Sequence, residues 1–292
     1  MAWLSLLADY TMRNVVLGSA LLGAVSGALG CFAVLRRQGL LGDTLAHAAL
    51  PGIALAYLLT GQRALPVLLA GAALSGWLGT AALIYLSRAT RIKEDSALGI
   101  VLSVSFAVGV VLLTFINRHP QSRAVGLERF LLGQAAALTA DQVELMALLS
   151  AGVLIVLVLG YKEFALLAFD APFAASLGWN TTALSLLLTT LIVITVVVGL
   201  QAVGVVLMAS LLIAPAVAAR QWTDRLHLMV WLAAAFGAIA GVMGAWLSAS
   251  DRGIPTGPVV VLVLSAITVV SLVVRRVRAW LARRAAKGEA ER

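Results

Sequence analysis

Long uninterrupted apolar runs constrain the fold of this chain more than any other feature of its sequence. The chain has 292 residues, of which 62% are hydrophobic and only 12% are charged. A soluble domain has about 25% charged and about 45–50% apolar residues. The excess apolar residues form runs of about 20, the length that crosses the hydrocarbon core of a bilayer as a helix. The sequence therefore predicts an all-α polytopic membrane protein.

We expect about nine transmembrane helices, with eight as the alternative. Their predicted limits are 15–35, 43–60, 65–86, 97–116, 143–160, 183–200, 203–219, 229–247 and 258–274. The second span is the weakest, because its start contains Gly42-Asp43-Thr44 and its middle contains Pro51-Gly52. A broken or re-entrant segment there would reduce the count to eight. Irregular backbone at membrane depth is tolerated only where it is buried in protein or lines a cavity.

The basic residues predict the orientation of the spans and the limits of the domains. With nine spans and the C-terminus inside, 15 of the 21 Lys and Arg residues fall on the inner side and six on the outer side. This asymmetry favours a cytoplasmic C-terminus. We expect residues 1–14 to form an amphipathic interfacial segment, 15–274 the transmembrane domain, and 275–292 a basic tail beside anionic lipid. The net charge of +8 is thus attributed to the membrane and not to nucleic acid.

Small residues inside the spans predict close helix packing. Gly23 and Gly27 are four residues apart, as are Gly237 and Gly241, and we expect both pairs to pack within the chain more than between chains. Cys31 is the single cysteine, so no disulfide framework is possible. We interpret it as a packed helix residue.

Asp43 and His47 are the strongest candidate functional residues. They are four residues apart, so a helix places them on one face. Ionisable groups at membrane depth are costly and usually mark a substrate or ion pathway. A carboxylate and an imidazole are also good ligands for a divalent transition metal. The alternative is a buried Asp–His hydrogen bond that only packs two helices together.

The segment 161–182 is neither hydrophobic enough to span a membrane nor polar enough to be a free loop. Asp170 can cap a short helix that begins at Ala171-Pro172, because Pro is favoured in the first turn. Gly178 can end this helix in a left-handed conformation. The apolar face of the helix is predicted to contain Phe173, Ala174 and Leu177. On a cytoplasmic connector this helix would dock another protein, and a helix lying on the bilayer is the open alternative.

The sequence lacks several enzyme motifs. It has no Gly-x-x-x-x-Gly-Lys-Ser/Thr phosphate loop, no Gly-x-Ser-x-Gly turn and no His-Glu-x-x-His helix. The three histidines are too few for a His-rich catalytic centre, and we expect His119 and His227 to be solvated loop residues. Glu94 and Asp95, close to Lys93, are expected in a solvated charge cluster. These absences favour a transporter or channel subunit that is not itself an enzyme.

Four segments follow one another in an order that matches a known pattern. They are Leu35 to Gly52 with its Gly-Asp-x-x-x-His signature, Arg91 to Ile100, Asp170 to Gly178, and Val203 to Ala219. Together they resemble the permease subunits of ABC importers for manganese, zinc and iron, over nearly the whole chain. The Ala-Leu-Pro-Gly after His47 is most similar to manganese-type members.

This resemblance implies a type II ABC importer-like permease in a prokaryotic cytoplasmic membrane. It implies a homodimer or a pair of related permeases, two cytoplasmic ATP-binding subunits that hydrolyse ATP, and an extracytoplasmic metal-binding protein. By position, Asp43 and His47 would contact the metal in the translocation path. The ATPase would dock on Asp170, Pro172, Phe173, Ala174, Leu177 and Gly178. No permanently bound cofactor is expected, since Mn²⁺, or else Zn²⁺ or Fe²⁺, would be the transported substrate.

Three functions compete on the sequence. The first is an ATP-driven metal importer permease with manganese preferred. The second is an ion-coupled secondary carrier, which is disfavoured because Asp43 and His47 are the only obvious titratable groups within the spans. The third is an ABC permease for iron–siderophore or vitamin cargo, which would not need this pair. A structural membrane scaffold is the least favoured interpretation.

Overall fold

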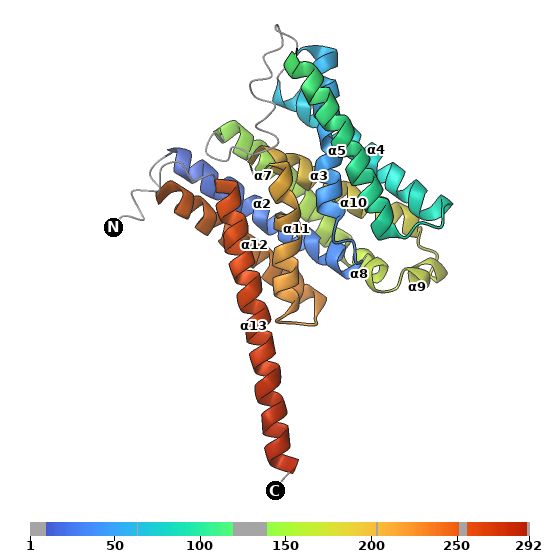
Figure 1. The fold of residues 1–292 in the computed structure, drawn as a ribbon. Helices are drawn as coiled ribbons and strands as arrows, with labels where there is room; N and C mark the ends of the chain where they lie inside the picture. The colour runs from blue at the N-terminus through green and yellow to red at the C-terminus, as the bar shows by residue number, and fades with distance from the viewer. Residues whose placement is uncertain (1–9, 63, 119–138, 203, 251–255, 291–292) are drawn as a thin grey trace.

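Helices make up all the regular structure that the computed structural model describes, in residues 10–62, 64–118, 139–202, 204–250 and 256–290 (Figure 1). In chain order they are α2 (Tyr10–Leu35), α3 (Leu41–Thr60), α4 (Leu65–Ala89), α5 (Glu94–Arg118), α7 (Ala140–Leu159), α8 (Tyr161–Phe169), α9 (Ala171–Ser176), α10 (Thr181–Ala202), α11 (Val205–Arg220), α12 (Leu226–Ser250) and α13 (Thr256–Ala290). The predicted all-α class is confirmed.

Seven described helices are long and apolar enough to cross a membrane. Their candidate spans are Met12–Leu35, Leu65–Ser87, Glu94–Arg118, Ala140–Leu159, Thr181–Leu200, Leu226–Ser248 and Thr256–Trp280. α11 contains a shorter apolar helix, Met208–Arg220. α3 corresponds to the predicted second span and is not among the seven. Each of the nine predicted spans is thus helical. α3, which was predicted to be the weakest span, has the length of a span but is less apolar than the seven candidates.

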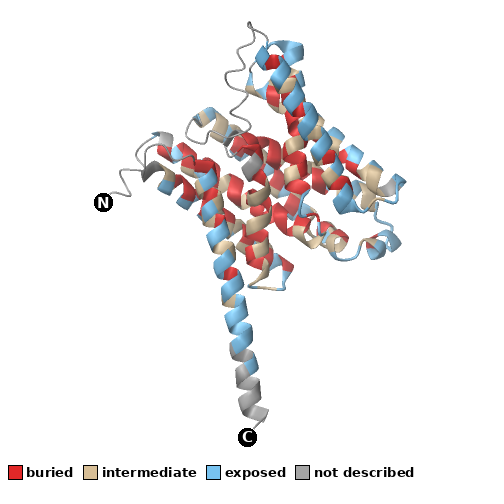
Figure 2. Ribbon diagram, viewed as in Figure 1, coloured by how far each residue is buried: buried red, intermediate tan, exposed pale blue. Residues whose placement is uncertain are grey.

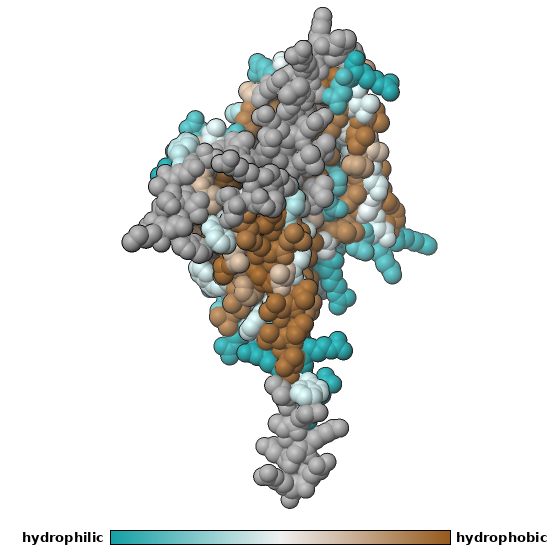
Figure 3. Space-filling view, turned by 60° about the vertical axis from the view of Figure 1, so that its left-hand side comes forward, coloured by the Kyte–Doolittle hydropathy of each residue, from teal (hydrophilic) through white to brown (hydrophobic). Residues whose placement is uncertain are grey.

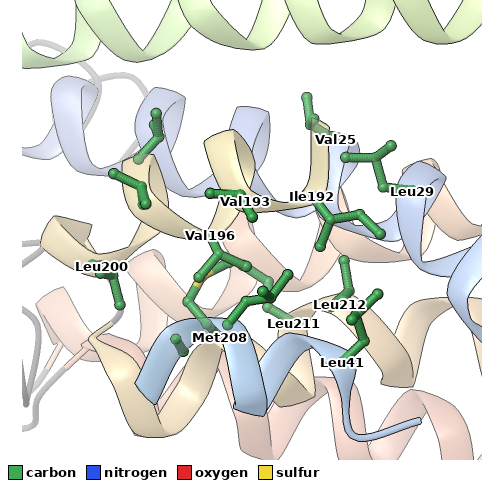
Figure 4. Close-up of a cluster of buried hydrophobic side chains, with 14 of the residues drawn as sticks. Val25, Leu29, Leu41, Ile192, Val193, Val196, Leu200, Met208, Leu211 and Leu212 are labelled. Atoms are coloured by element: carbon green, nitrogen blue, oxygen red, sulfur yellow. The ribbon is translucent and has the colours of Figure 1, made fainter. Parts of the chain in front are cut away.

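The core lies where α2, α3, α10 and α11 meet. Figure 4 shows side chains from these four helices pointing toward one another. All are buried, and they include Val25, Leu29, Leu41, Ile192, Val196, Met208, Leu211 and Leu212. Burial falls off toward the periphery (Figure 2), since 72% of the most apolar stretch of α2 is buried within the chain, against 17% for α5. α5 therefore leaves much of its apolar surface for lipid or another subunit.

Both glycine pairs serve the contact between α2 and α12. A side chain on Gly23 would collide with the carbonyl of Gly237, and one on Gly27 would collide with the carbonyl of Ala233. Gly241 likewise lies against the backbone of α2. Close helix approach within the chain is therefore confirmed as their role, because small residues let two backbones come together.

The described residues near both ends of the chain belong to the neighbouring long helices. α2 begins at Tyr10, so residues 10–14 of the predicted interfacial segment belong to the first long helix, while residues 1–9 lie outside the described part. α13 is a single helix from Thr256 to Ala290 that extends far beyond the other helices (Figure 1). The basic tail, up to residue 290, is therefore helical.

Candidate functional site

α3 is buried by its own chain along most of its surface, apart from one stripe. Asp43 and His47 lie on this stripe, with side chains 31% and 15% exposed. Pro51 and Leu55 continue it at the same spacing of four residues, and both are also partly exposed. We call these four residues the open stripe of α3. Polar groups at membrane depth are costly, so the position of Asp43 and His47 on this partly exposed stripe marks it as a candidate site.

The Asp43–His47 pair has the geometry of a loose contact. The Asp43 Oδ1 and His47 Nε2 atoms are 3.4 Å apart, whereas a good N–H···O hydrogen bond measures about 2.7–3.2 Å. His47 Nδ1 is buried and has no hydrogen-bond partner. The ring of Phe106 on α5 packs edge-on against the imidazole, with centroids 4.9 Å apart. Since both residues belong to α3, their mutual contact does not join two helices, and the buried Nδ1 atom is one whose lack of a partner among the described residues calls for an explanation.

Pro51 adds an oxygen donor to the same stretch of α3. In a helix the N–H of residue i donates to the carbonyl of residue i−4, and proline has no N–H. Pro51 lies inside α3, so the carbonyl of His47 lacks its usual helical donor. One helix thus offers a carboxylate oxygen, an imidazole nitrogen and a carbonyl oxygen. Among the described residues there is no group of three or more His, Cys, Asp or Glu that could hold a metal ion.

Contacts with neighbouring helices hold α3 in this orientation. The Thr44 hydroxyl lies 2.8 Å from the carbonyl of Leu40 and 3.3 Å from the carbonyl of Leu98 on α5, so that it can donate to either. The Ser75 hydroxyl of α4 donates to the carbonyl of Ala48. Gly52 lies directly against the backbone of α4, where any larger side chain would collide. These contacts fix the buried face of α3, so the open stripe is presented in one direction.

The second candidate site is the short helix α9, which has the predicted caps. The Asp170 Oδ1 atom accepts a hydrogen bond of 2.9 Å from the backbone N–H of Phe173, and Pro172 lies in the first turn. Gly178 has a φ of 87°, and its N–H donates to the carbonyl of Ala175 over 3.0 Å. Glycine adopts this left-handed conformation without steric cost. Local sequence therefore sets both ends of α9.

The docking face of α9 is smaller than the sequence predicted. Phe173 and Leu177 are 51% and 58% exposed, and we call these two residues the docking face. Ala174, predicted for the same face, is fully buried instead. One residue step turns a helix by about 100°, which directs Ala174 into the protein. Phe169 and Trp179, which the sequence analysis did not single out, are also exposed beside α9.

Polar contacts near the start of α3 connect helices that are distant in sequence. Arg36 donates a hydrogen bond of 2.8 Å from Nη2 to the hydroxyl of Ser185 on α10. Gln38 donates to the carboxylate of Glu94, so Glu94 takes part in a contact between segments and not only in the predicted solvated cluster. Burial lowers the pKa of Arg36, and attraction to Glu94 opposes that shift. The Arg36 contact joins the turn before α3 to α10, the helix that follows α9, and the Gln38 contact joins the same turn to the start of α5.

The remaining candidate residues lie elsewhere. Cys31 is buried on α2, with its Sγ 3.5 Å from the carbonyl of Gly27, and is not part of the open stripe. His227 is exposed, as expected, but it lies in the first turn of α12 and not in the predicted loop. His119 lies outside the described residues. Asp43 and His47 are therefore the pair on which a metal-path hypothesis rests.

Known proteins resemble this chain over most of its length. Residues 8–275 match the ABC 3 transport family. The chain belongs to the ABC 3 transport family. It is 48% identical over 271 residues to the zinc transport system membrane protein TroC of Treponema pallidum, covering 93% of this chain and 91% of that protein. It is also 48% identical over 260 residues to the manganese transport system membrane protein MntC of Bacillus subtilis, covering 89% of this chain and 60% of that protein.

The fold of this ABC 3 family chain is also found in a solved structure. PsaBC from Streptococcus pneumoniae in complex with Fab matches it with a TM-score of 0.81 at 28% identity, covering 92% of this chain and 94% of that one. The family resemblance and the permease fold predicted from sequence are confirmed. The relatives named for zinc and for manganese are equally identical to this chain, so their names favour neither metal.

Proposed function

We propose that this chain is the membrane-spanning permease of an ATP-driven importer of divalent transition-metal ions, with Mn²⁺ as the preferred cargo. The open stripe of α3, with its carboxylate and its imidazole, carries this proposal. Membership of the ABC 3 family and the zinc and manganese relatives support the class of cargo. ATP hydrolysis is assigned to a partner subunit, because the sequence has no phosphate-binding loop.

The donor set favours Mn²⁺ over softer metals. Carboxylate and carbonyl oxygens suit Mn²⁺, imidazole suits several transition metals, and thiolates select softer ions such as Cu(I). The one thiol of the chain, Cys31, is buried on α2. Zn²⁺ is the second candidate cargo, and Fe²⁺ the third. Since a transporter must release what it binds, two side-chain ligands from each subunit, completed by water or by a second subunit, match the task.

The proposed assembly has two permeases, two cytoplasmic ATP-binding subunits and an extracytoplasmic metal-binding protein. The ATPase would dock on Phe173 of α9 and on Leu177, which directly follows α9. Closure of the ATPase pair on ATP would move α9, and the Arg36–Ser185 contact would carry this motion from α10 to the turn before α3. The open stripe would then alternate between the two faces of a prokaryotic cytoplasmic membrane, with the C-terminus inside.

Metal uptake with and without the ATPase subunit tests this function. Cells would express the permease with its ATPase and binding protein, or the permease alone, and elemental mass spectrometry would measure Mn²⁺ and Zn²⁺ in each. We expect uptake only with the ATPase, with Mn²⁺ preferred when both metals are offered. Uptake by the permease alone, driven by a pH gradient, would instead identify a secondary carrier. ATP-dependent uptake of Zn²⁺ in preference to Mn²⁺ would keep the importer and change its cargo.

A further inference from the structure

A basic pocket lies between the α11–α12 connector (residues 221–225) and α13. Its volume is about 380 Å³. Three arginines line it, namely Arg220, Arg225 and Arg275. The pocket shares no residue with the open stripe of α3 or with the docking face of α9. The proposed function leaves it without a role.

The positive charge of the pocket is only partly balanced. Asp224 is the one acidic residue that lines it, and its side chain is 92% exposed. Arg220 lies beside Asp224, with Nη2 and Oδ1 3.5 Å apart. Within the described part of the chain, no carboxylate forms an ion pair with Arg225 or Arg275, although Arg275 donates a hydrogen bond of 2.9 Å to Gln221. These two guanidinium groups therefore keep donors for an anion.

An aromatic side chain fixes one wall of the pocket. Trp222 donates from its indole N–H to the hydroxyl of Ser271 on α13, over 3.0 Å. The guanidinium of Arg278 lies 5.2 Å from the centre of a Trp222 ring. Trp222 thus links the connector to α13 and holds a further positive charge nearby. Tryptophan is also the side chain most typical of the boundary between a membrane and water.

The pocket lies at the depth where several apolar helices end. Arg220 is the last residue of the apolar helix of α11, and the span of α12 begins at Leu226. On α13 the continuous apolar run stops at Val274, and Arg275 lies in the more polar last part of the candidate span Thr256–Trp280. Figure 3 shows the hydrophobic surface giving way to hydrophilic residues toward this end of the molecule. Leu228, which is 41% exposed, adds an apolar lining residue.

We infer that this pocket binds the headgroup of an anionic phospholipid. The planar guanidinium groups of Arg225 and Arg275 match the geometry of phosphate oxygens. Trp222 and Leu228 supply the apolar side on which the acyl region of the lipid lies. Basic pockets between spanning helices are suited to anionic headgroups. An acidic surface of a partner protein would not require a pocket at the depth of the span ends. This inference is independent of the proposed metal path.

Lipid binding to the purified full-length chain tests the inference. The chain would be stripped of lipid in detergent and titrated with phosphatidylglycerol or phosphatidylcholine, with occupancy measured by native mass spectrometry. We expect one tightly held phosphatidylglycerol per chain and weaker binding of phosphatidylcholine. The double variant Arg225→Gln/Arg275→Gln is expected to lose about 25-fold in affinity, since each basic residue near an anionic surface contributes about fivefold. The double variant Arg276→Gln/Arg283→Gln removes the same two charges from exposed positions on α13 outside the pocket and is expected to bind normally.

Four outcomes would overturn the inference. Equal affinity for the two lipids would remove the role of charge. Unchanged phosphatidylglycerol binding in the double variant would place the lipid elsewhere. Displacement of phosphatidylglycerol by inorganic phosphate, at a phosphate concentration similar to that of the lipid, would indicate a site for free anions. Loss of a protein partner by the double variant, with lipid binding retained, would assign the pocket to a protein interface.

Discussion

The open stripe of α3 and the docking face of α9 depart from their surroundings in opposite directions. α3 places Asp43 and His47 on a helix whose other faces are buried among apolar neighbours. α9 exposes Phe173 and Leu177 on a short helix outside the long spans. One region therefore has polar groups where apolar ones are expected, and the other has apolar groups where polar ones are expected.

Both regions mark places where we expect the chain to depend on other molecules. A buried polar atom without a hydrogen-bond partner, such as His47 Nδ1, is costly unless something else supplies the contact. An exposed apolar pair is costly in water unless a partner covers it. We infer that metal ions visit the stripe and that the ATPase subunit covers the docking face. A mutation on the open stripe should therefore impair metal transport without affecting ATPase binding, and a mutation on the docking face should impair ATPase binding without changing the stripe.

Loss of the carboxylate on the stripe should have the largest effect. In Asp43→Asn an amide replaces an anionic ligand, and we expect metal uptake by the whole transporter to fall about a hundredfold or more, because loss of even an outer-shell partner of a metal ligand costs about 10–100-fold. Binding of the ATPase subunit should not change. Asp141→Asn, at an exposed position on α7, is the matched control and should transport normally. Normal uptake in Asp43→Asn would show that the stripe does not contact the cargo.

A charged side chain on the docking face should reduce metal uptake nearly as much, because the ATPase subunit would bind less tightly. Phe173→Glu is expected to weaken association with the ATPase subunit roughly thirtyfold, as for loss of an aromatic anchor at an interface. Ala175→Glu adds the same charge to an exposed position of α9 that points away from Phe173. Co-purification and ATP-driven uptake would be measured for both. Equal losses in the two variants would show that any charge on α9 disrupts the helix and that Phe173 is not an anchor.

Removal of the cap of α9 should give an intermediate effect. Asp170→Ala loses the bond to the Phe173 N–H, which costs about 1 kcal/mol of helix stability, or about fivefold in a coupled binding equilibrium. Asp170→Asn keeps a capping oxygen and should restore association with the ATPase subunit. A titration with purified ATPase subunit would measure both. If neither variant differed from the parent chain, the fold of α9 would be set by tertiary packing and not by its cap.

The smallest effect is expected from the aromatic ring that packs on His47. Phe106→Leu removes the edge-on contact with the imidazole, which is worth about 0.5–1.5 kcal/mol in aromatic pairs. We expect the concentration of metal needed for half-maximal uptake to rise about threefold while the maximal rate is kept. A fall in the maximal rate with unchanged half-saturation would assign Phe106 to the movement of helices instead of to the orientation of His47.

Local sequence predicted the features that depend on neighbouring residues. Apolar run length located each long helix, and the spacing of Asp43 and His47 placed both on the open stripe. Asp170 caps the start of α9 and Gly178 follows its end, as predicted, because caps involve residues only a few positions apart. The weakness of the second span was also visible in its polar residues and its Pro51.

Features that depend on distant residues could not be predicted. Arg36 and Ser185 are 149 positions apart, and Gln38 and Glu94 are 56 apart, so no local pattern marks these contacts. The burial of Ala174 depends on how α9 packs, which its own sequence does not reveal. The predicted boundary before the basic tail follows hydropathy, whereas α13 continues because Ala, Leu, Arg and Lys are all good helix formers.

Metal uptake by a His47→Ala transporter would decide whether the open stripe of α3 contacts the cargo. The whole transporter would be expressed as the parent chain, as His47→Ala and as His227→Ala, which changes an exposed histidine in the first turn of α12. Elemental mass spectrometry would measure Mn²⁺ and Zn²⁺ at matched expression, and co-purification would report the bound ATPase subunit. We predict that uptake in His47→Ala falls to background with the ATPase still bound, while His227→Ala transports normally. Unchanged uptake in His47→Ala would show that the Asp43–His47 pair is a packing feature of α3 and does not contact the transported metal.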